Sequence, residues 1–371
     1  MKQRNTPQRL NDMNVDKARK QIDSIDEKIL QLLNDRAEAS KKIGRIKLKE
    51  GQGIYAPHRE KEVLDHLKAI NKGLLTPAAI EAIYREIMSS SISLEKEVRI
   101  AYLGPESTFT HQAAQKKFGA SVQYFPCTNI SDVFAEVERG RSDYGVVPVE
   151  NSTEGAVNYT LDMFIESGLK ICAELYLPIN HNLLSNAVSL KKINQIYSIP
   201  QALAQCRLWL ESNLPAARLM STSSTADAAR YVAEHPQFKN EIACIASTLA
   251  AKEYHLRVLA PSIEDSANNT TRFIVISRAE AKPSGKDRTS IVFAVKDRVG
   301  ALHDILLHFQ KANINLTKIE SRPSKKKIWS YFFFVDFEGH VAEPQIAQAL
   351  KNLEKHCTLF KILGAYPRAD F

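Results

Sequence analysis

The spacing of the apolar residues changes twice along the chain, and these changes divide it into three parts. From Val15 to Ile46 the apolar and small residues recur in steps of three and four, which predicts one long amphipathic helix. A second helix is predicted from Pro57 to Asn71. A third is predicted to begin at Thr76, as N-cap before Pro77, and to end at Glu95. The first part is therefore expected to be all helical.

From Val98 onwards, short β-rich runs such as VRIAYL, DYGVVPV and RFIVIS are separated by helical stretches. This alternation is typical of an α/β domain. The polar segment 279–288 contains proline and glycine and predicts a linker. Beyond it the order βαββαβ is expected, which is the small ferredoxin-like arrangement. The predicted division is a polar tail 1–11, an all-α domain 12–96, an α/β domain 97–278, the linker 279–288 and an α+β domain 289–371.

The composition of the 371 residues, 44% hydrophobic and 25% charged, is that of a globular protein. The formal charge of +8 is spread along the chain without interleaved aromatic residues, so anionic small molecules are favoured over nucleic acid as partners. Five scattered cysteines favour neither disulfides nor a zinc site, and no metal or cofactor is expected. No signal peptide or membrane-spanning run is apparent, so we expect a cytoplasmic protein without a membrane partner.

Two cations lie in or beside the apolar stripe of the first predicted helix, namely Arg36 and Lys47, and Arg59 and Glu60 follow at the start of the next. A buried structural ion pair is one interpretation. A binding site for a small dianion is the other. Arg19 does not fit a single-chain site, because seventeen residues of helix separate it from Arg36 by about 25 Å.

The run ARKQIDSIDEKILQLLNDRAEASKKIGRIK, followed by IYAPHRE, resembles the all-helical class of chorismate mutase over residues 12–96. The resemblance implies that the long helices of two subunits cross, so that the chain is at least a homodimer. It further implies that Arg36, and Arg19 of the other chain, bind the carboxylates of chorismate. The remaining roles implied are Lys47 at the breaking ether bond, Glu60 on the substrate hydroxyl, and further substrate contacts from Arg59, Ser91 and Glu95.

Two positions depart from this family pattern. Ala56 stands where some members carry an aspartate, so that one contact that orients the substrate is expected to be missing or replaced by backbone. Glu95 stands where many members carry glutamine. A carboxyl group donates a hydrogen bond only when it is protonated, so Glu95 is predicted either to donate in that form or to be a solvated residue at a helix end.

Three runs in the central part carry clustered polar residues: AYLGPESTFTHQAA, VVPVENSTEGAV and NNTTRF. The first is read either as an ordinary strand-to-helix turn or as an anion site. The second and third place polar groups at strand ends, where ligands bind in open α/β sheets. We interpret His111 and His181 as structural.

Together these runs resemble prephenate dehydratase over Val98 to Ser277, which implies two α/β lobes with the site between them. The residues implied in or near the site are Thr108, Glu150, Asn151, Ser198, Gln205, Thr271 and Arg272. Thr271 is the implied catalytic position, which we interpret as a hydrogen-bond donor to the departing hydroxyl. Arg272 is expected to anchor a carboxylate. Ser107 and Ile199 replace a glycine and a histidine common in the family.

In the C-terminal part, DRVGALHDIL and LTKIESRP resemble the ACT regulatory domain of dehydratases that respond to phenylalanine. The resemblance implies an L-phenylalanine site at Gly300, Ala301, Leu302, Glu320 and Ser321. The free amides at the start of a helix suit an α-carboxylate. A dimerisation module without ligand is the alternative. Residues 325–327 are predicted to form an exposed hairpin loop.

The three resemblances together predict a bifunctional enzyme of phenylalanine biosynthesis, inhibited by L-phenylalanine. Chorismate would be isomerised to prephenate, and prephenate would be converted to phenylpyruvate. A pure sensor, in which the helices serve only dimerisation, is a different class of function. The cations in the apolar stripe disfavour it, because dimerisation alone does not need them. One active and one inactive site is an intermediate possibility.

Overall fold

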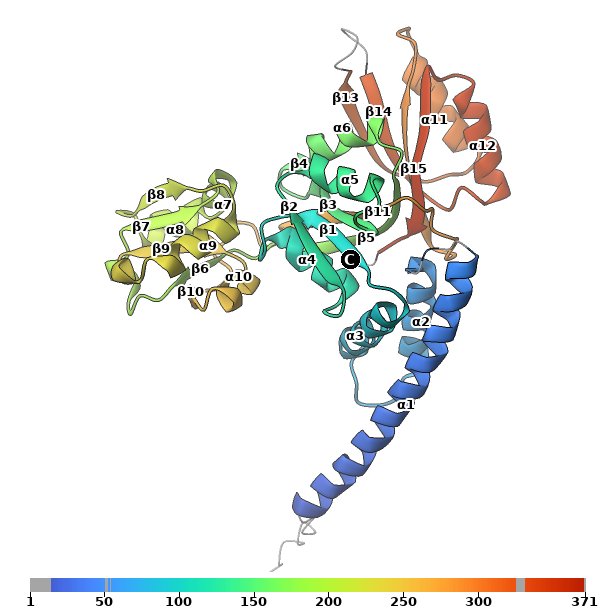
Figure 1. The fold of residues 1–371 in the computed structure, drawn as a ribbon. Helices are drawn as coiled ribbons and strands as arrows, with labels where there is room; N and C mark the ends of the chain where they lie inside the picture. Colours follow the sequence, from blue (N-terminus) through green and yellow to red (C-terminus); the bar gives the residue numbers. More distant parts are fainter. Residues whose placement is uncertain (1–14, 51–52, 54, 325–330, 370–371) are drawn as a thin grey trace, which may run out of the picture.

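The computed structural model describes residues 15–50, 53, 55–324 and 331–369. The predicted polar tail 1–11 and the predicted basic loop 325–327 lie outside these ranges. Figure 1 shows a helical N-terminal domain, a two-lobed central domain and a C-terminal domain that contacts the first lobe. None of the described helices has the length and hydrophobicity that crossing a bilayer requires.

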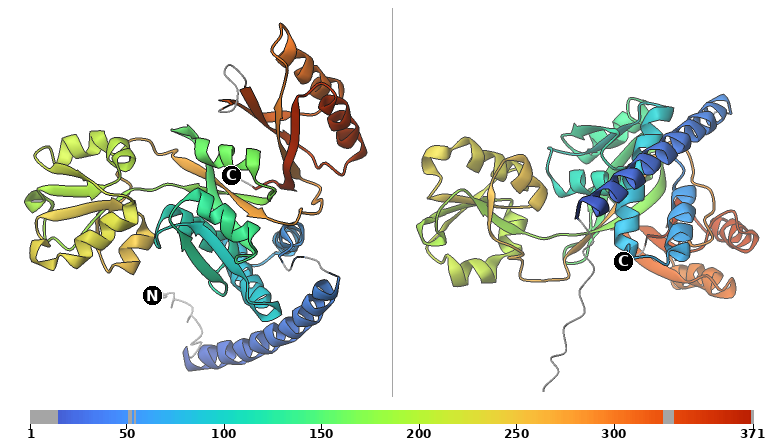
Figure 2. Two further views of the ribbon diagram at one scale, coloured as in Figure 1. Left: turned by 45° about the horizontal axis from the view of Figure 1, so that its top comes forward. Right: turned by 90° about the horizontal axis from the view of Figure 1, so that it is seen from below.

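The N-terminal domain consists of α1 (Val15–Lys49), α2 (Pro57–Ile70) and α3 (Pro77–Glu95), close to the predicted ranges. The hydroxyl of Thr76 accepts a hydrogen bond from the Ala79 amide at 3.2 Å, so it caps α3 as predicted. The N-terminal half of α1 extends beyond the other helices (Figures 1 and 2), and its apolar side chains are exposed.

The first lobe of the central domain contains a six-stranded sheet in the order β2-β1-β3-β11-β5, with β4 paired to β3. Its strands and helices are β1 (Arg99–Leu103), α4 (Phe109–Phe118), β2 (Gln123–Cys127), α5 (Ile130–Glu138), β3 (Tyr144–Asn151), β4 (Gly155–Ala156), α6 (Asn158–Glu166), β5 (Lys170–Pro178) and β11 (Thr270–Ser277). Strand β11 returns from the second lobe to pair between β3 and β5.

The second lobe has a five-stranded sheet in the order β10-β6-β9-β7-β8. Its elements are β6 (Asn182–Ser185), η1 (Leu190–Lys192), β7 (Gln195–Ser198), α7 (Pro200–Gln205), α8 (Arg207–Asn213), β8 (Arg218–Ser221), α9 (Thr225–Glu234), η2 (Pro236–Phe238), β9 (Ile242–Ala246), α10 (Thr248–Glu253) and β10 (Arg257–Ala260). The sequence analysis did not predict β2, β4, β6, β8 or β10, because these strands are short and lack a long apolar run.

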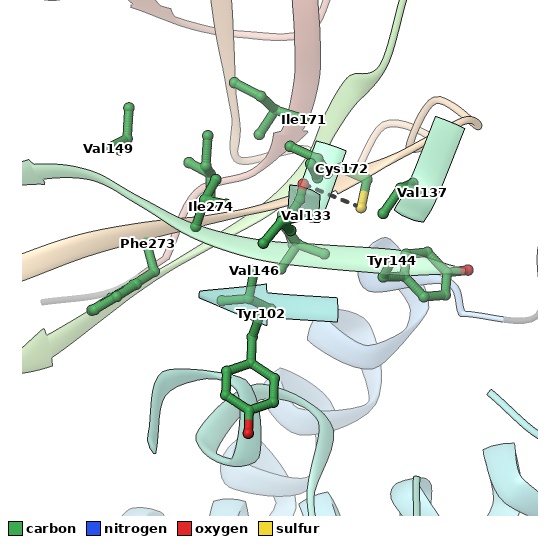
Figure 3. Close-up of a cluster of buried hydrophobic side chains, with 14 of the residues drawn as sticks. Tyr102, Val133, Val137, Tyr144, Val146, Val149, Ile171, Cys172, Phe273 and Ile274 are labelled. Atoms are coloured by element: carbon green, nitrogen blue, oxygen red, sulfur yellow. Dashed lines mark hydrogen bonds between the residues drawn. The ribbon is translucent and has the colours of Figure 1, made fainter. Parts of the chain in front are cut away.

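The core of the first lobe is built from both faces of its sheet. Figure 3 shows Phe273 and Ile274, consecutive residues of β11, pointing to opposite sides of the strand. Val133 and Val137 of α5 belong to the same buried cluster. The four cysteines of the central domain are buried and form no disulfide among the described residues, whereas Cys357 is partly exposed.

The C-terminal domain has the predicted order βαββαβ, with the sheet order β13-β14-β12-β15. Its elements are β12 (Asp287–Ala294), α11 (Ala301–Lys311), β13 (Leu316–Pro323), β14 (Tyr331–Glu338), α12 (Pro344–Glu354) and β15 (Leu359–Pro367). Strand β12 thus begins inside the predicted linker 279–288. Gly364 of β15 lies against β5, where a Cβ atom would stand only 2.1 Å from the Ile171 carbonyl oxygen.

Candidate active sites

A cavity of about 670 Å³ lies where the helical domain meets the central domain. Six of the residues predicted from the sequence line it: Arg36, Lys47, Arg59, Glu60, Ser91 and Glu95. They come from all three helices, so residues far apart in the sequence surround one space. The opposite wall belongs to the central domain and the segment that follows it, and includes Lys117, Phe118, Tyr144 and residues 279–282.

Helices α1 and α3 hold the predicted groups through direct hydrogen bonds. Arg36 donates through Nη1 to the Ser91 hydroxyl. Ser40 donates to Oε1 of Glu95 at 2.7 Å. Gly44 makes room for Glu95, because a Cβ at this position would lie 2.6 Å from the Cγ atom of Glu95. The two helices are therefore close enough to present a guanidinium and a carboxyl group to the same cavity.

The carboxylate of Glu60 is held by two residues that the sequence analysis did not single out. Oε2 accepts from the Tyr55 hydroxyl at 2.9 Å and lies 3.0 Å from Nζ of Lys117. Burial, followed by the charge of Glu60, raises the pKa of Tyr55 well above its usual value, so its hydroxyl remains a donor. Lys117 belongs to α4, and no pattern within the helical segment pointed to it.

Two predicted arginines lie further from the centre of this cavity. Arg59 is at its rim, with an exposed side chain paired to Glu62 at 2.9 Å. Arg19 lies in the projecting half of α1, where its exposed side chain is 3.7 Å from that of Asp16. Arg19 is not among the residues that line the cavity, in agreement with the sequence prediction that it cannot reach the same site within one chain.

In the central domain, strands β3 and β11 bring Asn151 and Thr271 side by side. Nδ2 of Asn151 donates to the Thr271 hydroxyl and to Oδ1 of Asn269, both at 2.8 Å. Asn269 in turn donates to Oε1 of Gln205 at 3.0 Å. Because Gln205 belongs to α7, this chain of polar groups joins the two lobes.

His181 lies at the end of this polar chain, with Nε2 at 2.9 Å from Oε1 of Gln205. Burial lowers the pKa of His181, so the imidazole is neutral at neutral pH. The sequence interpretation of His181 as structural left out this contact with a predicted site residue. Asn269 was also not singled out, although it lies within the quoted NNTTRF run.

Two other predicted residues are engaged in local structure. Thr108 caps α4, accepting from the His111 amide at 3.3 Å and donating to the Pro105 carbonyl at 3.0 Å. The buried Ser198 donates to the Ile245 carbonyl at 2.8 Å. Ser107 has a φ of 64°, in the left-handed region that favours glycine. This agrees with its position as the replacement of a family glycine.

Arg272 and Glu150 differ from the prediction that they lie at the dehydratase site. They are paired across β3 and β11, one residue away from Asn151 and Thr271, and therefore face the other side of the sheet. The guanidinium of Arg272 is buried between the first lobe and the C-terminal domain. It binds Glu174 of β5 on one side, and Asp336 and the Tyr366 hydroxyl of the C-terminal domain on the other. Glu150 lies 2.9 Å from Nζ of Lys318. An interdomain role thus replaces the expected carboxylate anchor.

The predicted ligand-binding residues of the C-terminal domain lie on two elements. Gly300 is the N-cap of α11, with a φ of 79° and no side-chain cap, and Ala301 and Leu302 form the first turn. Glu320 and Ser321 lie in β13, which is an edge strand of the sheet. Ser321 is exposed there.

Three family models match this chain, one in each of the three described domains. The chorismate mutase type II model matches residues 18–96, the prephenate dehydratase model matches residues 100–281, and the ACT domain model matches residues 289–355. A relative from Aquifex aeolicus, named bifunctional chorismate mutase/prephenate dehydratase, is 52% identical over 95% of this chain and 97% of its own. One of the same name from Pseudomonas aeruginosa is 45% identical, with the same coverage.

A crystal structure of prephenate dehydratase from Arthrobacter aurescens, in complex with L-Phe, resembles this chain with a TM-score of 0.68 and 38% identity. The match covers 74% of this chain and 91% of the Arthrobacter aurescens chain. The retained helical cavity and the relatives' names favour two activities over a pure sensor. The chain belongs to the family of bifunctional chorismate mutase/prephenate dehydratases with an ACT domain, and is an enzyme with both activities.

Proposed function

We propose that the chain converts chorismate to prephenate in the helical cavity and prephenate to phenylpyruvate at the Thr271 network, as a cytoplasmic step of phenylalanine biosynthesis. The observation that carries this proposal is the grouping of Arg36, Lys47, Glu60 and Glu95 around one cavity. A second polar site, around Thr271, lies in a different domain. We propose domain ranges of 12–96, 97–278 and 289–371, joined by 279–288, and the three family matches support this division.

The mutase reaction is a concerted rearrangement, so it needs no nucleophile. Catalysis depends on holding the substrate in a reactive conformation and on stabilising charge at the ether oxygen. In our proposal Arg36 binds one carboxylate, Lys47 approaches the ether oxygen, and Glu60 accepts from the substrate hydroxyl. Ser91 and Arg59 contribute to substrate binding. The hydrogen bond from Arg36 to Ser91 supports their action as one group.

In the dehydratase reaction the bond between the ring and the carboxylate attached directly to it breaks, releasing carbon dioxide, while the pyruvyl side chain stays on the ring. The electrons of the broken bond make the ring aromatic and expel the ring hydroxyl, which leaves as water after gaining a proton. We propose that Thr271 donates a hydrogen bond that strengthens as charge develops on the departing oxygen. The hydroxyl of Thr271 already accepts from Asn151, which leaves its proton available for the substrate. Asn151, Gln205 and Ser198 would hold the substrate, and Thr108 would fix the nearby turn.

A homodimer follows from the same proposal. The exposed apolar stripe of α1 includes Ile22, Ile25 and Ile29, each at least 46% exposed. A second long helix crossing this stripe would bury it and would bring the partner's Arg19 to Arg36, which α1 alone separates by about 25 Å.

We propose that L-phenylalanine inhibits the enzyme by binding at Gly300, Ala301 and Leu302, with Glu320 and Ser321 facing its ammonium group and a neighbouring subunit. The L-Phe complex of the related dehydratase supports this. A side chain at Gly300 would strain its left-handed backbone. Gly300→Ala and Ser321→Ala should therefore weaken inhibition in a phenylpyruvate assay while turnover without phenylalanine persists. Unchanged inhibition in both variants would contradict this site.

Both activities can be tested separately by supplying purified protein with chorismate and following prephenate and phenylpyruvate. Thr271→Ala should lower dehydratase turnover by about a hundredfold, as expected when one hydrogen-bond donor to a charge that develops in the transition state is removed. Mutase turnover should persist, because Thr271 lies outside the helical cavity. The matched control is Thr270→Ala, on the same strand but facing the other side, which should change little. An equal loss of both activities in Thr271→Ala would contradict the proposal.

A further inference from the structure

The chorismate mutase cavity is not formed by the helical domain alone. Lys117 and Phe118, at the C-terminal end of α4 in the dehydratase domain, line the same cavity as Arg36 and Glu95. Nζ of Lys117 lies 3.0 Å from Oε2 of Glu60, and both side chains are largely shielded from solvent, with exposed fractions of 20% and 15%. A charge-assisted contact in such a setting is stronger than one on the open surface.

The end of α4 is fixed firmly against the mutase helix α3. The amide of Ala120 donates to Oε2 of Glu86 at 2.9 Å, and the amide of Ser121 donates to Oγ of Ser89 at 3.0 Å. Gly119 lets the backbone turn there, with a φ of 72° and no room for a Cβ, which would lie 2.6 Å from the Cβ of Ser89. Lys117 is thus presented to the cavity from a defined position rather than from a loose surface chain.

The second residue that holds Glu60 also depends on the dehydratase domain. Tyr55 precedes α2, but its ring packs into the first lobe, with its centroid 4.9 Å from that of Phe118 and 5.3 Å from that of Tyr144. Nζ of Lys117 lies 5.8 Å from the same ring centroid. Tyr55 and Lys117 both bind Oε2, and among the described residues none donates to Oε1. This arrangement leaves Oε1 for the substrate.

We propose that Lys117 of the dehydratase domain is a positioning residue of the chorismate mutase site, which orients Glu60 through Oε2 so that Oε1 meets the substrate hydroxyl. The inference rests on the proposed role of Glu60 in the mutase. Removing the ammonium group would leave the carboxylate held by Tyr55 alone, and it would rotate more freely. The dehydratase domain would in this way contribute to the first reaction without touching its substrate.

The test uses the full-length enzyme and measures both activities for Lys117→Met, Lys117→Arg, Glu60→Gln and the double variant Glu60→Gln with Lys117→Met. Lys117→Met should lower mutase kcat/KM by about tenfold, as expected for a lost hydrogen bond to a charged group. Dehydratase kcat/KM should stay within about twofold. Lys117→Arg should retain most of the mutase activity, because it restores the positive charge and the donor. Lys116→Met is the control, since Lys116 donates to the Tyr176 carbonyl within the dehydratase domain.

The double variant identifies the route of the effect. If Lys117 acts through Glu60, its removal should cost little once Glu60 is glutamine, so the two losses should not add. Additive losses, an equal decline of both activities, or full mutase activity in Lys117→Met would overturn the inference. A fully active Glu60→Gln enzyme would instead contradict the proposed role of Glu60 itself, and with it the basis of the inference.

Discussion

The two carboxyl oxygens of Glu95 have different surroundings. Its Oε1 accepts from Ser40, whereas its Oε2 is buried in the cavity wall without a hydrogen-bond partner among the described residues. A proton on Oε2 would make this oxygen a donor toward the ether oxygen of chorismate, which a bare carboxylate could not be. The close fit of Gly44 against the Glu95 side chain keeps the group in this position.

We predict that Glu95→Gln retains or raises the mutase activity, because a glutamine amide always offers a hydrogen-bond donor to the ether oxygen. Glu95→Ala, which removes the donor, should lower mutase kcat/KM by about a hundredfold. Mutase kcat/KM of the two variants and the parent, measured side by side, provides the test. A glutamine variant as slow as the alanine variant would show that Glu95 is not the donor.

His181 supports a second prediction at the scale of a residue. Burial depresses its folded-state pKa, so the stability gained by keeping the imidazole neutral is complete above the unfolded-state pKa of about 6.5. That stability is lost as the pH falls through the lower folded-state pKa. In His181→Asn this part of the acid dependence should disappear. Urea unfolding of parent and variant at a series of pH values measures it, and parallel curves would contradict the prediction.

At the scale of the elements, strand β11 serves two sites with its two faces. Thr271 faces the dehydratase network, and the next residue, Arg272, faces the ACT domain, where it binds Asp336 of β14. Glu174 of β5 binds both Arg272 and Arg288 of β12. Because Arg272 binds Asp336, a displacement of the ACT sheet would also displace Arg272, which directly follows Thr271 in the chain.

We predict that Asp336→Asn loosens this contact between β11 and β14. Removing one partner of a buried ion pair leaves the other charge poorly compensated, and the expected loss in the free energy of unfolding is about 3 kcal/mol. The control is Glu338→Gln on the same strand, whose pairing with Arg368 is exposed and should contribute less than about 1 kcal/mol. Denaturant unfolding of both variants compares them. Equal losses would argue against a special role for the buried pair.

The same pair implies an acid dependence. Burial by itself would raise the pKa of Asp336, but the charge of Arg272 and the hydrogen bond from Ser290 outweigh it, and the pKa lies below its usual value. The stability it contributes is complete above the unfolded-state pKa of about 3.9 and is lost as the pH falls through the lower folded-state value. Asp336→Asn should remove this component of acid unfolding.

At the scale of the whole molecule, we predict that one mutase site needs two chains. Arg19→Ala and Arg36→Ala should each lose mutase activity, but a mixed dimer would retain one site in which both arginines are intact. Mixing the two inactive proteins under conditions that allow subunit exchange should restore part of the activity. The two variants alone, treated in the same way, are the controls. Exchanged heterodimers without activity would rule out the crossed-helix arrangement.

The sequence by itself determined the elements whose cause is local. The three- and four-residue spacing of α1 and the Thr76–Pro77 start of α3 specify helices through contacts within a few residues. The βαββαβ order of the C-terminal domain was predicted in the same way. The chorismate mutase resemblance implied Arg36, Lys47, Glu60 and Glu95 as site residues, and all four line the same cavity; their catalytic roles are our proposal. Helix geometry alone predicted that Arg19 and Arg36 of one chain lie too far apart to bind the same small molecule.

Only the tertiary structure decided which distant groups meet. Short strands such as β2 and β8 exist because neighbouring strands pair with them, not because of their own pattern. Alternation along β11 separates Thr271 from Arg272, and the position of the ACT sheet determines what Arg272 binds. Lys117 is fifty-seven residues from Glu60 and lies in another domain, so no local spacing joins them. Their contact depends on the docking of α4 against α3, which packing across the domain boundary sets.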